Sequence, residues 1–223
     1  DHRDLHSFPT RRSSDLNVLI QSSLYTIHDY TINGIPINEN EILAGASASQ
    51  QIESYIFAML DAFAVGIISL VGQNFGAGKK TNIRKSYWYS FTWMMIFWVI
   101  CSIICGLFPY QLLSIFVKES EGIVIKNALD AGKERLFIMA FTYFLDGWMD
   151  INSNYLRGMK YSTPSAIITM IGCSGLRILF LTTLFNVPTF HTIFWLYAVF
   201  PLSWILVNLV YIPVVLQIGR AHV

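Results

Sequence analysis

Residues 87–107 read YWYSFTWMMIFWVICSIICGL and contain no charged side chain. A helix needs about 20 largely apolar residues to cross a bilayer, because each residue adds about 1.5 Å along the axis. A helix of a soluble bundle keeps a polar outer face, and this run has none. The stretch therefore predicts a helix that crosses a lipid bilayer.

The composition of the whole chain is also typical of a membrane protein. Of the 223 residues, 54% are hydrophobic and only 13% are charged, and the mean hydropathy is +0.49. The net charge of +1 indicates no basic surface, so we expect no nucleic-acid partner. The three cysteines, Cys101, Cys105 and Cys173, lie in apolar runs, which argues against a disulfide framework or a zinc site.

The two ends of the chain differ from the rest. Residues 1–16 are polar and aperiodic, and they resemble the translation of a sequencing adapter; residues 218–223 resemble the opposite adapter. Segments of this kind are excluded before the fold is considered. We expect both ends to be artefacts and residues 17–217 to be the biological segment, cut at both ends.

Apolar stretches long enough to cross a bilayer recur along residues 17–217. They predict an all-α, polytopic membrane protein with five complete transmembrane helices and the end of a sixth. The expected spans are residues 17–27 (partial), 55–75, 87–107, 136–156, 165–185 and 192–216.

Basic residues between the expected spans predict how the chain is oriented. Cytoplasmic loops of membrane proteins carry an excess of lysine and arginine. Two loops are basic, and they hold Lys79, Lys80, Arg84, Lys85, Arg157 and Lys160. We expect these two loops to be cytoplasmic, and we expect the acidic segment 28–54 and the mixed-charge segment 108–135 to be outer loops.

Four ionisable side chains fall inside the expected spans: Asp61, Asp146, Asp150 and Arg177. Each charge costs about 2.5–3.5 kcal/mol at a helix centre, so we expect all four to face the bundle interior or water. Asp146 and Asp150 are four residues apart and share a helix face. A salt bridge between Asp146 and Arg177 is the structural interpretation, but it leaves two carboxylates without a cation.

The excess of carboxylates indicates ion coupling. Crowding in a low-dielectric environment favours protonation of at least one carboxyl group, as a proton carrier requires, while a hydrated carboxylate pair could instead hold Na⁺. The ion-coupling candidates are Asp150, Asp146 and Asp61, with Arg177 as their buried charge partner. We expect no catalytic residues, no cofactor and no metal beyond Na⁺ at Asp146 and Asp150, and therefore no enzyme.

Four motifs, in order along the chain, connect it to a known family. They are VGQNFGAG at 71–78, LRG at 156–158, GCSGLRI at 172–178 and FPLSW at 200–204. Together they resemble the carboxy-terminal half of bacterial-type multidrug and toxic compound extrusion (MATE) transporters over essentially all of residues 17–217. The structural motif residues are Gly72, Gln73, Asn74, Gly76, Gly78, Arg157 and Gly158.

The resemblance implies a fold of twelve helices in two six-helix lobes around a cavity that opens alternately to either side. This chain would supply the end of helix seven and helices eight to twelve, and the amino-terminal lobe of the same chain would be missing. The family members are antiporters of the cell membrane, here the bacterial inner membrane, that export small organic cations and drugs in exchange for H⁺ or Na⁺. An aspartate upstream of the Arg-Gly pair belongs to their cation-coupling site, and both Asp146 and Asp150 fit.

Two other functions stay open at this point. A lipid-linked oligosaccharide flippase of the same superfamily would favour a more basic cavity than one arginine among three aspartates provides. A non-transporting membrane receptor or scaffold would need a ligand-binding or signalling domain, and the loops between the expected spans are mostly short.

Overall fold

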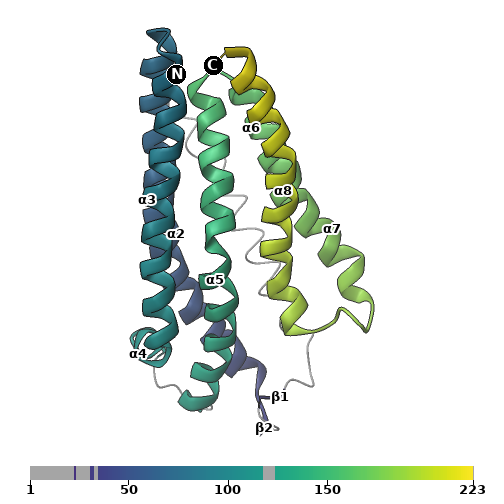
Figure 1. Cartoon of the computed structure of the whole chain (residues 1–223). Coiled ribbons are helices and arrows are strands. Elements are labelled where there is room, and N and C mark those ends of the chain that lie inside the picture. The colour runs from purple at the N-terminus through teal and green to yellow at the C-terminus, as the bar shows by residue number, and fades with distance from the viewer. Residues whose placement is uncertain (1–22, 24–30, 33–34, 118–123, 223) are drawn as a thin grey trace, which may run out of the picture.

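The computed structural model describes residue 23 and residues 31–32, 35–117 and 124–222 (Figure 1). The expected partial span, residues 17–27, lies outside the described residues except for Ser23, and the expected artefact at residues 1–16 lies outside them completely.

Helices make up most of the described chain, in agreement with the all-α expectation. The exception is an antiparallel pair of two-residue strands, β1 (Thr31–Ile32) and β2 (Ile35–Pro36). The helices are α2 (Glu39–Gly76), α3 (Lys80–Leu107), α4 (Pro109–Ser114), α5 (Ile125–Gly158), α6 (Ser162–Thr169), the π-helical η1 (Met170–Gly175), α7 (Leu176–Thr182), the 3₁₀ turn η2 (Leu184–Asn186) and α8 (Ile193–His222).

Among the described residues, four helical segments are long and apolar enough to cross a membrane: Glu39–Gly76, Lys80–Leu107, Ser162–Asn186 and Ile193–Ile218. The expected span 136–156 corresponds to α5, which is long enough but carries more polar and charged residues. It nevertheless packs against α2, α3 and α8 at the centre of the bundle (Figure 1). The chain is therefore a multi-pass membrane protein, while the count of five spans and part of a sixth stays a prediction.

Three expected spans lie within helices that begin well before them. The helix that contains the span 55–75 begins at Glu39, the one that contains 87–107 begins at Lys80, and the one that contains 136–156 begins at Ile125. Residues 39–54, 109–114 and 125–135, which were expected to belong to outer loops, are thus helical. Several polar side chains of these segments bond within the bundle, among them Glu41, Glu53 and Arg135.

Glu41 explains why α2 and α5 begin before the expected spans. Its carboxylate accepts a hydrogen bond from the backbone N–H of Asn38, 3.2 Å away, which caps the first turn of α2. It also accepts hydrogen bonds from the backbone N–H of Val124 at 3.0 Å and from the side-chain amide of Asn127 at 2.9 Å. One carboxylate therefore holds the first turns of α2 and α5 together.

The backbones of α2 and α5 meet at two glycines. A Cβ atom on Gly132 would lie 2.7 Å from the carbonyl oxygen of Gly45, and one on Gly45 would collide with the carbonyl oxygen of Ala128. Small residues of this kind allow membrane helices to approach closely. The contact allows α2 and α5 to pack side by side in the turns that come after these glycines.

The segment Ser162–Asn186 is not a uniform α-helix. Between α6 and α7, η1 widens into a π-helix, a form that often occurs as a short bulge at functional sites. A side chain on Gly172 in η1 would collide with Val207, so η1 packs directly against α8.

The turn from α2 to α3 and the turn from α5 to α6 lie at the same end of the bundle, at the top of Figure 1. The basic residues predicted to lie in two cytoplasmic loops therefore share one side. Lys80, Arg84 and Lys85 belong to the first turns of α3 and Arg157 to the last turn of α5, rather than to loops. The start of α5 and the turn from α7 to α8 lie at the opposite end.

Candidate functional site

The three candidate aspartates come from two helices that pack side by side. Asp61 lies on α2, and Asp146 and Asp150 lie on α5. Asp146 is buried, while Asp61 and Asp150 are half-buried. Asp146 interacts electrostatically with Asp61, and Asp150 interacts with both of the other aspartates and with Arg157. The structure thus gathers the three acids into one electrostatic group.

The three carboxylates of this aspartate group do not surround a common position for a bound ion. Within the described part of the chain, no set of three or more His, Cys, Asp or Glu side chains is placed to hold a metal ion together. The three carboxylates act on one another through space. Like charges at such positions repel, and each one that takes up a proton or a cation relieves the other two.

Arg177 lies beside the group but is held by α8. Its Nε donates a 3.0 Å hydrogen bond to the Ser203 hydroxyl, and its guanidinium lies 4.4 Å from the centre of the Phe200 ring and 5.7 Å from that of Trp204. Its charge acts on Asp146 through space, but within the described residues the two form no salt bridge. The interpretation of Asp146 and Arg177 as a salt bridge is therefore wrong, because Arg177 stacks on aromatic rings instead.

A buried ion pair that the sequence analysis missed joins α2 to α5. Arg135 donates two hydrogen bonds to Glu53, from Nε to Oε1 at 2.8 Å and from Nη2 to Oε2 at 2.9 Å. The carboxylate also accepts hydrogen bonds from the hydroxyls of Ser49 at 2.8 Å and Tyr143 at 3.4 Å. The guanidinium lies over the ring of Tyr197, with 5.3 Å between its Cζ and the ring centre. Both charges are therefore fully engaged.

A pattern in the sequence could have revealed Glu53. Apolar and small residues recur at spacings of three and four through the first half of α2, and all of them are buried: Ile42, Ala46, Ser49, Ile56 and Leu60. Glu53 stands in this series, four residues after Ser49 and three before Ile56. An acidic residue on the apolar stripe of a helix indicates a buried partner.

Hydrogen bonds tie the helices around the aspartates. The Tyr87 hydroxyl on α3 donates to Oδ1 of Asn152 at 2.8 Å, and the Asn152 amide donates to Oδ1 of Asn208 on α8 at 3.1 Å. Asn208 in turn donates to the backbone carbonyl of Leu145 at 2.8 Å. Asn152 lies two residues after Asp150, so this chain fixes the part of α5 that carries the acids. Neither Asn152 nor Asn208 is among the residues predicted from the sequence.

The glycines of two sequence motifs meet at the basic end of the bundle. A Cβ atom on Gly158 would lie 2.8 Å from Cβ of Val71, and one on Gly72 would lie 3.7 Å from the carbonyl oxygen of Gly158. α2 ends at Gly76, and Gly78 adopts a φ of +66°, a left-handed conformation that favours glycine.

The polar motif residues bond locally. The Gln73 amide donates to the Ser69 hydroxyl at 3.2 Å, and the Asn74 amide donates to the Leu70 carbonyl at 2.7 Å. Arg157 is exposed and donates to Oδ1 of Asn154 at 3.4 Å. These residues shape the helix ends and do not approach the aspartates as ligands, apart from the charge of Arg157, which acts on Asp61 and Asp150.

Comparison with known proteins identifies the family. The family model MatE matches residues 15–183, which is more than half of the chain. The chain belongs to the MatE family. The resemblance to MATE transporters that the motifs indicated is thereby confirmed. No curated protein sequence matches the chain.

Membership in the MatE family makes the chain part of a transporter family rather than an enzyme family. The match includes α2, α5 and α7 of this MatE chain, which carry the aspartates and Arg177, and it ends before α8. Carboxylates in such a setting can take up and release protons or attract cations.

Proposed function

We propose that this MatE chain is part of a secondary antiporter that exports small organic cations or drugs in exchange for H⁺ or Na⁺. The observation that carries the proposal is the group of Asp61, Asp146 and Asp150 on the packed helices α2 and α5. An antiporter needs acids that alternate between loaded and empty states, and repulsion within the group favours loading. The setting we propose is the cell membrane, with both basic loops in the cytoplasm.

The charge balance supports a cationic substrate. Glu53 and Arg135 neutralise each other, so the three aspartates face Arg177 and, from the end of α5, the exposed Arg157. The aspartates therefore still outnumber the arginines that act on them. An excess of negative charge attracts cations and repels the phosphate groups of lipid-linked oligosaccharides. The balance thus favours an exporter of organic cations over a flippase.

The experiment is transport of a fluorescent organic cation by everted vesicles that contain the complete open reading frame around this chain. An imposed pH gradient and an imposed Na⁺ gradient are applied separately. Asp146→Asn or Asp150→Asn is expected to reduce gradient-driven transport by roughly tenfold or more, because the amide cannot exchange a proton or balance a cation.

Asp130→Asn is the matched control, since it makes the same change near the start of the same helix. Its carboxylate accepts a 2.8 Å hydrogen bond from the exposed Tyr110 and takes no part in the aspartate group. Transport should persist in this variant. Undiminished transport in both Asp146→Asn and Asp150→Asn would overturn the proposal.

A further inference from the structure

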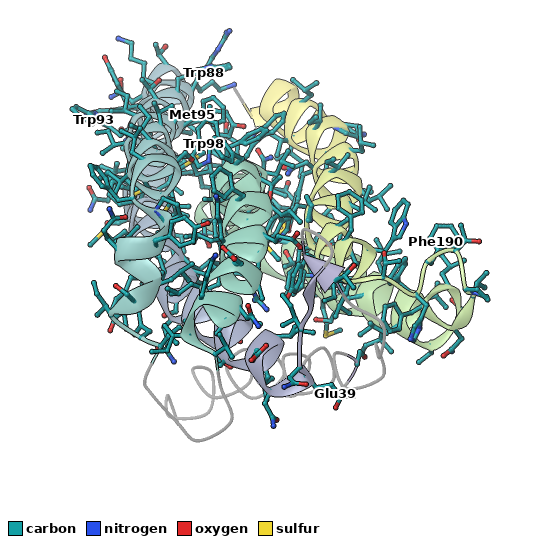
Figure 2. All side chains as sticks on the ribbon, turned by 90° about the horizontal axis from the view of Figure 1, so that it is seen from below. Glu39, Trp88, Trp93, Met95, Trp98 and Phe190 are labelled. Atoms are coloured by element: carbon teal, nitrogen blue, oxygen red, sulfur yellow. The ribbon has the colours of Figure 1, made fainter. Side chains whose placement is uncertain are left out.

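A hollow of about 440 Å³ lies on the outer face of α3, near its start. Its lining comes entirely from this helix: Thr81, Arg84, Lys85, Trp88, Tyr89 and Thr92. All six side chains are exposed. In Figure 2, Trp88 and Trp93 lie on the side of the bundle formed by α3, away from α8.

The chemistry of the hollow is that of an anion site. Arg84 and Lys85 bring two positive charges, Thr81 brings a hydroxyl, and no acidic side chain lines the hollow. Trp88, which lines the hollow together with both cations, stands edge-on to the rings of Tyr87, 5.5 Å away, and Phe91, 5.9 Å away. Two cations and an aromatic wall suit a phosphate attached to an apolar body.

An apolar stripe continues from the hollow along α3. It consists of exposed side chains at spacings of three and four, which form one face of a helix. Its members are Tyr89, Trp93, Ile96, Ile100, Ile103 and Leu107. From Tyr89 to Leu107 the stripe covers about 27 Å at 1.5 Å per residue, close to the thickness of the hydrocarbon core. The hollow therefore lies at the basic end of an exposed apolar stripe.

We propose that the hollow binds the head group of an anionic phospholipid whose acyl chains lie along the apolar stripe of α3. The lipid phosphate accepts hydrogen bonds from Arg84, Lys85 and Thr81, and the rings of Trp88 and Tyr89 lie at the level of the glycerol. The hollow shares the end of the bundle that carries both basic loops, the side where basic residues meet anionic lipids. The proposal does not depend on the transport function.

The test is native mass spectrometry of the purified protein in mild detergent, titrated with phosphatidylglycerol or phosphatidylcholine. We expect one phosphatidylglycerol to be retained by the wild-type protein, and Arg84→Gln/Lys85→Gln to reduce its retention by roughly tenfold. Lys79→Gln/Lys80→Gln is the matched control. It removes two charges from the same end of the bundle but from outside the hollow, and it should retain the lipid.

Four outcomes would overturn the proposal. Equal loss in the two double variants would mean diffuse attraction by the basic end, and unchanged retention in Arg84→Gln/Lys85→Gln would mean that the hollow is not used. Equal retention of phosphatidylcholine would mean that the stripe alone holds lipid. Displacement by inorganic phosphate at equal concentration would identify a soluble anion as the ligand.

Arg84→Lys/Lys85→Arg keeps both charges. Lipid retained by this variant and lost by the glutamine variant would show that the loss comes from the missing charges and not from misfolding.

Discussion

Glu53 and Asp146 are carboxylates on neighbouring helices with nearly the same burial, 5% and 4% exposed, but their surroundings differ. Glu53 accepts two hydrogen bonds from Arg135 and a third from Ser49. Asp146 receives no comparable set of donors from the described residues, and the nearby Arg177 bonds to Ser203.

The difference separates two uses of a buried charge. A carboxylate whose oxygens are all paired holds two helices together and is costly to change. A carboxylate that faces other acids, beside an arginine that bonds elsewhere, is the kind that the proposed antiport requires. Burial alone does not distinguish these uses, whereas the number of hydrogen-bond donors does.

The largest effect should follow from breaking the Glu53–Arg135 pair. Arg135→Met leaves a buried, unpaired carboxylate and should lower the free energy of unfolding by about 3–5 kcal/mol. Thermal unfolding in detergent measures it. Replacing both residues, as Glu53→Met/Arg135→Met, should recover most of the loss, because no charge then stays unpaired. Equal stability of Arg135→Met and the wild type would remove the contrast with Asp146.

A smaller effect on the free energy of unfolding should follow from a change at Gly45, where the backbones of α2 and α5 touch before the Glu53–Arg135 pair. Gly45→Ala places a methyl group against the carbonyl of Ala128 and should cost about 1–3 kcal/mol through the forced separation of α2 and α5. Gly66→Ala on the same helix is the matched control, because its Cβ would meet nothing within 4 Å. If the two variants unfold at the same temperature, the close approach of α2 and α5 does not support the pair.

The smallest effect on stability is expected at Asp146. Asp146→Asn removes a buried charge that Arg177 attracts and the other aspartates repel, and these contributions oppose each other. The unfolding free energy of this variant should therefore stay within about 0.5 kcal/mol of that of the wild type. Thermal unfolding in the detergent used for Arg135→Met gives the comparison. A loss as large as that of Arg135→Met would show that Asp146 is a structural residue like Glu53.

The apolar spans and the acids within them could be predicted, because hydropathy over about 20 residues is a local property of the sequence. The true start of α5 could not be predicted in this way, since the polar residues that precede its expected span bond across helices. The start of α2 carries a local signal, the capping box of Asn38 and Glu41, in addition to its bonds across helices. Glu41 meets Val124, and Glu53 meets Arg135, only after α2 and α5 pack.

Arg177 shows the same limit. Its position in a span predicted an interior location, but its depth in the membrane did not reveal which helix it faces. Phe200 and Trp204 lie one turn apart on α8 and offer it ring faces, so the arginine stacks there instead of closing a salt bridge with Asp146.

The π-helical segment η1 determines the direction in which the side chains of α7 point around the helix axis. A π-turn closes its hydrogen bond over five residues where an α-turn uses four, so η1 takes up additional chain between α6 and α7. One residue of an α-helix corresponds to a rotation of about 100°. Deleting a single residue from η1 would therefore turn Arg177 away from Ser203 while leaving the apolar character of the span unchanged. In this helix the count of residues, as much as their identity, determines which side chain faces α8.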